Sequence, residues 1–322
     1  YHLFLRRRVF RGVISLPICL RRPRVLHSDQ PSQNTAPKGP IKSVWGIALM
    51  ASAMFCFAIV DTLAKLLTDS FHPLQIVWMR QLGLGVGVVV YLIVRGPGAL
   101  KSAKPYWQIV RGAAAALSAT LFIFGIAHIA LTDATAITFV APLFVTILGA
   151  TVLREPVGIR RWSAVFVGFL GTIIIVRPGF ESFHPAYFLI FTAAFLFAVR
   201  QVVSRHLSTV DKTATTVAYT AFASILMLGV FQPAVWITPE TGIHIAMIVA
   251  MAALGGAGEF LVIKSLEIAT SVSVAPMHYT IIIWTSLYGY LVFDKIPDTL
   301  FWVGTILIIM SGLYVLARGN KK

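Results

Sequence analysis

Ten long apolar runs dominate the sequence and restrict the folds open to the chain. Each holds close to the roughly 20 apolar residues that an α-helix needs to cross about 30 Å of hydrocarbon. None shows the alternation of apolar and polar residues that a membrane β-barrel strand requires. The sequence therefore predicts an all-α integral membrane protein with ten transmembrane helices, at residues 43 to 67, 73 to 94, 106 to 130, 132 to 153, 160 to 177, 184 to 206, 213 to 236, 242 to 267, 270 to 293 and 299 to 317.

Charge distribution sets the expected orientation of these helices. The net charge of +15 could indicate nucleic acid, but no basic groove interleaved with aromatic residues is present. Lysine and arginine instead fall in alternate connections, which is the positive-inside pattern. We expect a multi-pass protein in a lipid bilayer with both termini in the cytoplasm and no nucleic-acid partner.

The chain also contains an internal duplication. Phe55, Phe57 and Ala58 recur in order as Phe195, Phe197 and Ala198. Two further sets of matches follow in the same order and at nearly the same spacing: Ile129, Ala130, Ala136 and Glu155 with Ile268, Ala269, Ala275 and Asp294, and Gly171 and Arg177 with Gly312 and Arg318. We predict two five-helix units, residues 43–177 and 184–318.

An odd number of helices in each unit makes the two units inverted with respect to each other. The second unit enters the membrane from the opposite side, so Lys65 and its counterpart Arg205 end helices at opposite faces. Inverted repeats are the architecture of alternating-access carriers, whose site lies near the membrane midplane between the halves. Carriage of a solute is therefore the leading hypothesis.

The first 42 residues are rich in arginine and hold one short apolar piece, Val13 to Leu20. This piece is too short to cross a membrane, and it lacks the features of a signal peptide. We interpret residues 1–42 as a disordered basic tail at the cytoplasmic surface. The chain's two cysteines, Cys19 and Cys56, indicate no disulfide framework.

At family level, the sequence resembles the EamA-type carriers of the drug/metabolite transporter superfamily. The resemblance lies in the ten-helix duplication, the run T-D-A-T-A-I-T-F-V-A-P-L-F followed by L-R-E-P, and A-P-M-H-Y followed by F-D-K-I-P-D. V-W-M-R-Q around Arg80, I-V-R-G around Arg111 and A-P-M-H-Y around His278 look most like a bacterial metabolite-uptake branch that includes S-adenosylmethionine and riboflavin carriers. The resemblance implies a secondary transporter of a small polar or zwitterionic metabolite in a bacterial cytoplasmic (inner) membrane. It also implies a cavity built mainly from helices 1, 3, 4, 6, 8 and 9, which favours Asp61, Phe139, Glu259 and His278 over Arg80.

Ionisable residues deep in the apolar runs are the candidates for a binding site, because a charge in hydrocarbon is costly unless it is paired or hydrated. Arg80 can hold a carboxylate or phosphate through its planar fork, or can pair with an acid on a neighbouring helix. Glu259 follows Gly255, Gly256 and Gly258. These glycines either loosen the helix around a cation or proton site or only permit close helix packing.

Other polar candidates lie closer to helix ends or to a proline. His278 and Tyr279 follow Pro276 on the ninth helix, where His278 can donate to a substrate or be satisfied by a neighbour. Asp61 and Lys65 have the i, i+4 spacing of a pair on one helix face, which fits a capped helix end or a gate. Arg111 and Arg200 are expected to extend to the inner surface.

Aromatic residues are candidates for stacking against a planar substrate or for ordinary contacts with lipid and neighbouring helices. They are Phe55, Phe57, Phe122, Phe139, Phe195, Phe197 and Trp284. The expected substrate-binding set is therefore Asp61, Arg80, Phe139, Glu259, His278, Tyr279 and Trp284.

The sequence contains no metal-ligand constellation, catalytic triad or nucleotide-binding loop, so we expect no cofactor and no enzymatic activity. The alternative is a membrane-embedded enzyme or a non-transporting helical scaffold. Acids and histidines dispersed over several helices disfavour the enzyme, and charges near the midplane disfavour the scaffold. A homodimer is compatible with the sequence, which does not decide it.

Overall fold

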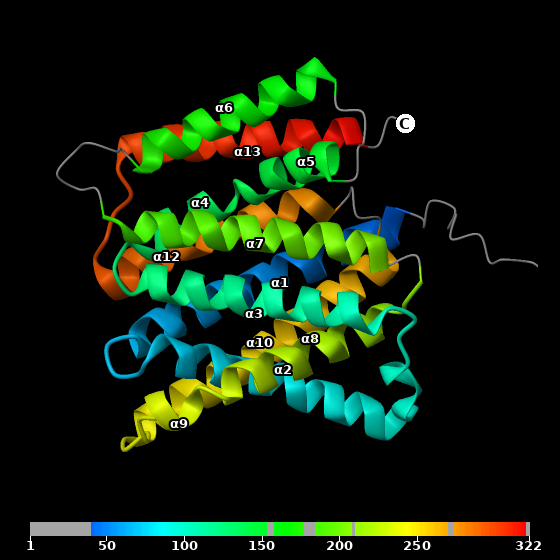
Figure 1. Ribbon diagram of the computed structural model, residues 1–322. Helices are drawn as coiled ribbons and strands as arrows, with labels where there is room; N and C mark the ends of the chain where they lie inside the picture. The colour runs from blue at the N-terminus through cyan, green and yellow to red at the C-terminus, as the bar shows by residue number, and fades with distance from the viewer. Residues whose placement is uncertain (1–39, 153–157, 177–183, 208–209, 270–273, 320–322) are drawn as a thin grey trace, which may run out of the picture. The chain divides into compact units, whose positions relative to one another are not determined.

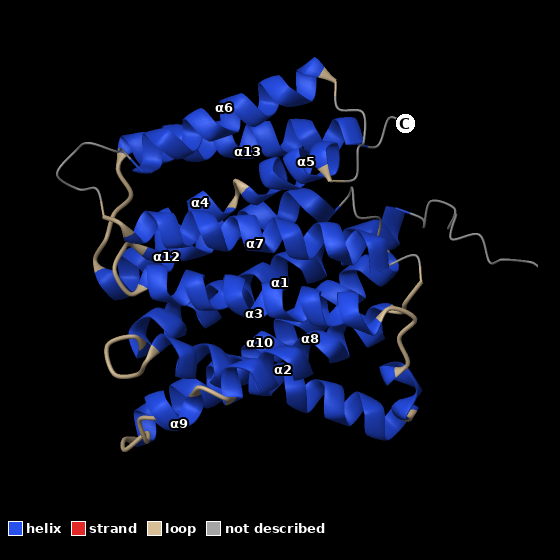
Figure 2. Cartoon of the chain, in the orientation of Figure 1, coloured by secondary structure: helices blue, strands red, loops and turns tan. Residues whose placement is uncertain are grey.

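The structure, a computed structural model, describes residues 40–152, 158–176, 184–207, 210–269 and 274–319, and all regular structure in these ranges is helical (Figure 2). The expected basic tail lies outside the described residues up to position 39. Helix α1 begins at Pro40, three residues before the predicted span. The repeat matches at Glu155 and Arg177 also fall outside the described ranges.

The first half of the chain forms six α-helices and one 3₁₀ turn. They are α1 (Pro40–Leu67), α2 (Pro73–Arg95), η1 (Pro97–Leu100), α3 (Pro105–Ile126), α4 (Leu131–Thr138), α5 (Ala141–Thr151) and α6 (Ile159–Val176). Proline opens both α2 and α3, where its missing N–H has no intrahelical partner to lose. The side chain of His72 accepts a hydrogen bond from the Leu74 N–H and so caps the start of α2.

The second half forms a similar series of helices. They are α7 (Ala186–Leu207), α8 (Thr213–Gly229), α9 (Gln232–Val235), α10 (Gly242–Ile268), η2 (Ala275–Tyr279), α12 (Thr280–Phe293) and α13 (Thr299–Gly319). The Thr241 hydroxyl caps α10 by accepting from the His244 N–H. Helix α12 ends where Asp294 adopts a left-handed conformation (φ 53°, ψ 33°).

Six described helical segments are long and apolar enough to cross a membrane. They are Val44–Leu67, Pro73–Arg95, Pro105–Ile126, Leu131–Thr151, Ala186–Leu207 and Gly242–Ser265. Three shorter apolar helices run over Trp162–Val176, Thr213–Gly229 and Thr299–Tyr314. Each of the ten predicted runs thus coincides with helix, and six of them meet the length and composition of a membrane span on the described residues.

The helices pack in pairs that combine the two halves of the chain. Helix α1 packs along α10, α3 packs along α7, and α6 packs along α13 at the upper edge of Figure 1. Helix α2 contacts both α8 and α10, and α8 also contacts α3.

Glycines bring several of these helices into close contact. A methyl group added at Gly83 of α2 would lie 1.9 Å from the carbonyl oxygen of Ala252 in α10. A methyl group at Gly171 of α6 would lie 2.7 Å from the carbonyl oxygen of Gly304 in α13. Small residues at helix crossings let backbones approach in this way where hydrophobic association is weak, as in a bilayer.

Two predicted spans are interrupted rather than continuous. The fourth consists of α4 and α5, separated at Phe139 and Val140, with Pro142 at the start of α5. In the ninth, the 3₁₀ turn η2 leads into α12 at Thr280. Irregular backbone at membrane depth is tolerated where it is buried in protein or lines a cavity. Both interruptions contribute residues that the sequence identified as candidates.

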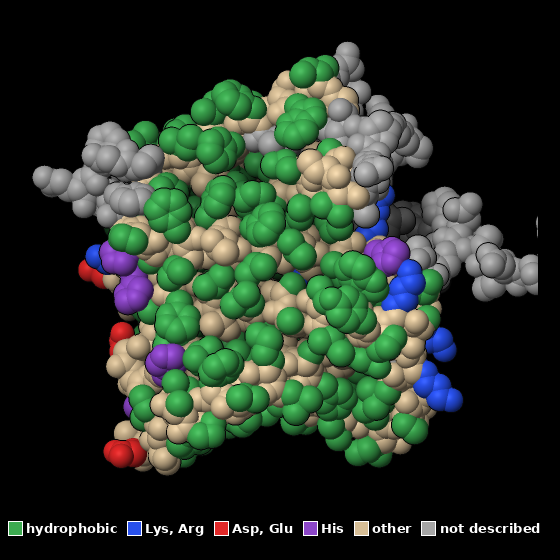
Figure 3. All heavy atoms as spheres, in the orientation of Figure 1, with side chains coloured by type: hydrophobic (Ala, Val, Ile, Leu, Met, Phe, Trp, Pro, Cys, Tyr) green, Lys and Arg blue, Asp and Glu red, His purple; other side chains and the backbone are tan. Residues whose placement is uncertain are grey.

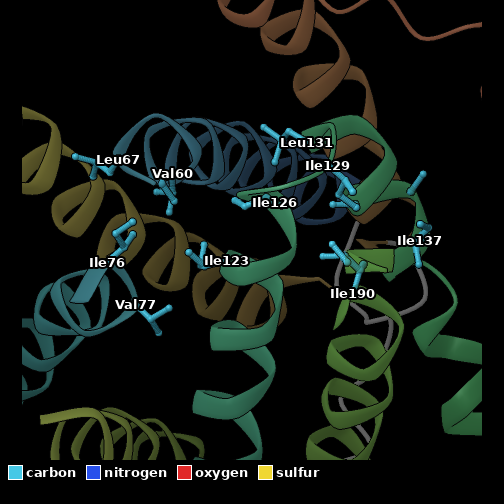
Figure 4. Close-up of a cluster of buried hydrophobic side chains, with 14 of the residues drawn as sticks. Val60, Leu67, Ile76, Val77, Ile123, Ile126, Ile129, Leu131, Ile137 and Ile190 are labelled. Atoms are coloured by element: carbon cyan, nitrogen blue, oxygen red, sulfur yellow. The ribbon is translucent and has the colours of Figure 1, made fainter. Parts of the chain in front are cut away.

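The main buried cluster joins elements of both halves. Figure 4 shows Val60 and Leu67 of α1, Ile76 of α2, Ile123 of α3 and Ile190 of α7 among its side chains. These residues are essentially inaccessible to solvent. The packed cluster holds the ends of α1, α2 and α3 in fixed relation to α7.

The visible surface separates charge from apolar side chains. In Figure 3 most acidic and histidine side chains lie at the left edge, lysine and arginine lie mainly at the right edge, and apolar side chains cover the middle. The element bounds explain this: Asp69 and Glu240 lie in the α1–α2 and α9–α10 connections, whereas Arg95 and Arg205 fall in the last turns of α2 and α7.

Candidate functional site: a buried cluster of charges between two helix pairs

The first part of the site is an ion pair between α1 and α2. Arg80 donates from Nη1 to Oδ1 of Asp61 over 3.1 Å. The Asp61 side chain is 10% exposed and that of Arg80 is 23% exposed. Of the two interpretations of Arg80, the structure therefore favours the structural pair with an acid on a neighbouring helix. Each member of such a pair offsets part of the cost of burying the other.

The expected pairing of Asp61 with Lys65 is wrong. Lys65 turns away from Asp61 and donates from Nζ to the carbonyl oxygens of Ile126 (2.5 Å) and Ile129 (2.9 Å), at and just past the end of α3. Carbonyls at a helix C-terminus lack intrahelical partners and carry partial negative charge, so they attract a cation. Lys65 thus ties the end of α1 to the end of α3.

Arg111 of α3 is held by hydrogen bonds from two other helices. Its Nε donates to the Ser204 hydroxyl of α7 over 2.6 Å, and its Nη1 donates to the carbonyl oxygen of Thr216 (3.3 Å) and to the Thr220 hydroxyl, both in α8. The expectation that Arg111 extends to the inner surface is therefore incorrect. Hydroxyl and carbonyl oxygens of α7 and α8 supply partners inside the bundle, so the guanidinium need not reach water.

Arg200 of α7 adjoins Arg111 through Ser204. The Ser204 hydroxyl that accepts from Arg111 itself donates to the Arg200 carbonyl oxygen over 2.6 Å. The guanidinium of Arg200 stacks over the Phe197 ring, 4.9 Å from its centroid, and its Nε is buried without a hydrogen-bond partner in the described parts of the chain. Arg200 also departs from the expected surface position, because it remains against its own helix.

Glu259 of α10 completes the cluster. It is the acid of the apolar helices that lies closest along the chain to the contact of α10 with Arg80. The stem of Arg80 runs close to Gly255, one turn before Glu259 on α10: a methyl group at Gly255 would lie 3.9 Å from Cγ of Arg80. We call Asp61, Arg80, Arg111, Arg200 and Glu259 the charge cluster.

The glycines before Glu259 serve packing rather than a helix break. Helix α10 is continuous from Gly242 to Ile268. A methyl group at Gly256 would lie 3.3 Å from the Gly83 carbonyl oxygen, and one at Gly258 would lie 2.8 Å from the Phe57 ring. Of the two interpretations of these glycines, the structure supports close packing.

Phe139 and Tyr279 meet where the two interrupted spans contact each other. Their ring centroids are 4.7 Å apart, with the ring planes tilted by 33°. The Tyr279 hydroxyl is buried next to Gly312 of α13 and has no hydrogen-bond partner among the described residues. The structure thus brings together two predicted residues that are distant in sequence, as an aromatic pair.

The other two predicted site residues lie on η2 and α12 of the ninth span. Trp284 of α12 packs edge-on against Phe55 of α1, with ring centroids 5.0 Å apart, and Phe55 is 39% exposed. The His278 side chain is exposed on η2.

Sequence reasoning missed Arg111 and Arg200 as members of the site. A signal was present, because both arginines occur about two turns inside predicted spans. Thr216 and Thr220 are also spaced i, i+4, which places their hydroxyls on one face of a helix. Only the packing of α3 on α7 and α8 shows that these hydroxyls meet an arginine.

Hydrogen bonds also join helix ends to connections on both sides of the site. Gln75, near the start of α2, forms two hydrogen bonds with the backbone of Ile237. Its Nε2 donates to the Ile237 carbonyl oxygen over 2.7 Å, and its Oε1 accepts from the Ile237 N–H over 2.9 Å. Asp211, just before α8, accepts from the Ser102 hydroxyl (2.5 Å), the Ala103 N–H (2.8 Å) and the Gln108 amide (2.8 Å). Burial acts to raise the pKa of Asp211, but these hydrogen bonds and the charge of Lys104 outweigh it and hold that pKa below its ordinary value.

An apolar hollow between α5, α6 and α7 is a poor alternative for a polar ligand. Its lining includes Leu143, Phe144, Trp162 and Phe166, with no charged side chain. In the part of the chain that the structure describes, no group of three or more histidine, cysteine or acidic side chains is arranged to hold a metal ion. The charge cluster therefore remains the candidate site.

Comparison with known families now identifies the chain. The sequence profile of the EamA-like transporter family matches it twice, over residues 44–177 and 184–317. The chain belongs to the EamA-like transporter family. This confirms the resemblance seen in the sequence.

Several members of the EamA-like transporter family are similar along most of their length. The S-adenosylmethionine uptake transporter of Rickettsia prowazekii is 23% identical over 86% of this chain and 94% of its own. The riboflavin transporter of Vibrio cholerae is 27% identical over 86% of this chain and 94% of its own length. The pseudopaline exporter CntI of Pseudomonas aeruginosa is 27% identical over 86% of this chain and 97% of its own length. A protein of known crystal structure shares the fold with a TM-score of 0.60 at 16% identity, covering 86% of this chain and 99% of the other.

Proposed function

We propose that this protein is a secondary transporter that moves a small polar or zwitterionic metabolite across a bacterial cytoplasmic membrane by alternating access. Membership of the EamA-like transporter family supports carriage of a metabolite. The observation that carries the proposal is the charge cluster, because five ionisable side chains inside apolar helices are costly unless they serve a polar ligand or one another.

The packing supports an arrangement of ten spans as two inverted five-helix repeats. In the predicted repeats α1 corresponds to α7 and α3 corresponds to α10. The contact of α1 with α10 then corresponds to the contact of α7 with α3, and both contacts are present. In the same way α2 corresponds to α8, so the contact of α2 with α10 corresponds to the contact of α8 with α3. The interrupted spans α4–α5 and η2–α12 also correspond, and both place an aromatic residue at the interruption.

The distribution of the charge cluster supports an alternating-access site. Glu259 belongs to the α1–α10 pair, and Arg111 and Arg200 belong to the α3–α7 pair, so the cluster draws on both helix pairs. Carriers of this kind bind substrate near the midplane between repeats and expose it by rocking one bundle against the other. A scaffold would not require charged side chains within both helix pairs.

Orientation follows from the basic residues. Arg95, Arg205 and the other basic residues of alternate connections would face the cytoplasm, which places both termini there. The direction of transport is open, since the relatives named above include uptake transporters and an exporter. A homodimer is compatible with this topology and is not required by the site.

Uptake by proteoliposomes tests the proposed function. The full chain is reconstituted and offered radiolabelled S-adenosylmethionine, riboflavin, and aromatic and cationic amino acids, with and without a proton gradient. We expect saturable uptake of at least one compound above the level of protein-free liposomes. Variants Glu259→Gln and Arg200→Gln are expected to lose most of this uptake while still inserting and folding. Unchanged uptake in both variants would contradict the assignment of the charge cluster as the site.

A further inference from the structure

Basic and aromatic side chains gather where the start of α3 meets the end of α7. Nζ of Lys104, just before α3, lies 2.7 Å from Nε2 of His206, in the last turn of α7. The Trp107 ring packs edge-on against the His206 ring, with the two centroids 5.9 Å apart. Tyr106 packs edge-on against Trp107, again with centroids 5.9 Å apart. These contacts form a continuous set from the last turn of α7 to the first turn of α3.

The adjoining connections bring further positive charge to the same place. The Ser102 hydroxyl and the Ala103 N–H both donate to Asp211, which holds the segment before α3 against the α7–α8 connection. The basic residues of these segments are Lys101, Lys104, Arg205 and Lys212. Asp211 is the one acid among residues 101–107 and 205–213, so four basic residues against one acid leave an excess of three positive charges.

The aromatic side chains place this region at the boundary between water and hydrocarbon. Tyr106 is 70% exposed and Trp107 is 43% exposed. Rings with an apolar body and a polar tip are typical of the membrane–water interface. Ile109, the next exposed residue of α3, continues the apolar surface toward the middle of the helix. Figure 3 shows the same change, from lysine and arginine at the right edge to apolar side chains over the middle.

We propose that a basic–aromatic patch, formed by Lys101, Lys104, Tyr106, Trp107 and Arg205, binds the headgroup of an anionic phospholipid. Charge complementarity selects this partner, because the phosphate of such a lipid adds a net negative charge that the basic residues attract. A zwitterionic lipid carries its own cation and has no net charge to offer. The inference concerns the surrounding membrane and does not depend on which metabolite is transported.

The shape of the patch also favours a lipid over a soluble acidic partner. The cations lie at the ends of α3 and α7, and the exposed rings lie on the side of α3 that leads to Ile109. A phospholipid matches this order, with its phosphate at the cations and its acyl chains along the apolar surface. An acidic soluble protein would leave that apolar surface uncovered.

Lipid titration tests the inference on the full chain in a neutral detergent. Binding of dioleoyl phosphatidylglycerol and of dioleoyl phosphatidylcholine, which have the same acyl chains, is measured by native mass spectrometry. We expect phosphatidylglycerol to bind about 10- to 30-fold more tightly, since each basic residue near a headgroup contributes roughly 5-fold. Equal binding of the two lipids would overturn the inference.

Side-chain variants locate the effect. Lys104→Gln is expected to weaken binding of phosphatidylglycerol about 5-fold and to leave phosphatidylcholine unchanged. Lys101→Gln, at an exposed position before α3, provides a second variant with the same expectation. The matched control is Lys264→Gln, an exposed lysine of α10 whose replacement removes the same charge outside the patch. Equal losses in the control and in both patch variants would show an effect of net charge alone and overturn the patch.

Inorganic phosphate distinguishes a lipid site from a site for a free anion. The titration with phosphatidylglycerol is repeated in excess phosphate and in sodium chloride of the same ionic strength, so that screening is equal in both. We expect the same affinity in the two salts, because phosphate lacks the acyl chains that hold the lipid on α3. Complete displacement of the lipid by phosphate would overturn the assignment to a lipid.

Discussion

At the scale of single residues, the Asp61–Arg80 pair should act as one energetic unit. Replacing Asp61 by asparagine leaves Arg80 as an uncompensated charge between α1 and α2. Removing one member of a buried pair costs about 3 kcal/mol, whereas removing both leaves no unpaired charge. We predict that Asp61→Asn lowers the thermal midpoint more than the double variant Asp61→Asn/Arg80→Gln does, measured by unfolding in detergent. Effects of the two single changes that simply add would contradict this coupling.

Depth in the apolar runs pointed to Asp61, which is buried, and to Arg80 and Glu259, which are half-buried, but not to their surroundings. The i, i+4 spacing of Asp61 and Lys65 permits a pair on one helix, and it cannot indicate that Ile126 and Ile129 present free carbonyls to Lys65. Arg200 was assigned to the inner surface because it lies near the end of its predicted span. Its neighbours come from other helices, so local sequence holds no direct information about them.

At the scale of helices, the α2–α10 crossing depends on Gly83. A methyl group there would collide with the Ala252 carbonyl, which is backbone and cannot rotate away. We predict that Gly83→Ala destabilises the protein by about 1–3 kcal/mol. The control Gly87→Ala, on the same helix with nothing within 4 Å of the added methyl group, should change stability by less than about 1 kcal/mol. Equal effects in denaturation experiments would contradict the close crossing.

The contact between the η1–α3 connection and Asp211 should depend on pH. Because the folded pKa of Asp211 lies below the unfolded value of about 3.9, its contribution to stability is present above the unfolded pKa and is lost as pH falls through the folded pKa. We predict that wild type exceeds Asp211→Asn in thermal midpoint at pH 7, and that this difference shrinks toward pH 3. A difference that stays constant over this range would contradict an ionised Asp211 as the acceptor.

Element positions were the most predictable part of the fold. Length and hydropathy located helix in all ten predicted runs, because a span must satisfy its own backbone. The interruption at Phe139 was not predicted, although Pro142 lies just beyond it. The short helix α9 was included in the longer predicted span 213 to 236, because apolar residues resume after Gln232 and Pro233.

At the scale of the whole molecule, the proposed inverted repeats would place the ends of α1 and α7 on opposite sides of the membrane. Asp69 follows α1, and Arg205 lies in the last turn of α7. With the native cysteines replaced, we predict that Asp69→Cys is labelled from outside by a membrane-impermeant maleimide and Arg205→Cys only from the cytoplasmic side. Labelling of both from the same side would contradict the inverted topology.

The central claim is that one site is reached alternately from the two sides of the membrane. Counterflow in proteoliposomes tests this most directly: vesicles preloaded with an unlabelled transported compound are diluted into the same compound carrying a radiolabel. Alternating access predicts that preloading accelerates entry of the label several-fold and produces a transient overshoot. Entry at the same rate into loaded and empty vesicles would contradict a carrier and indicate a pore.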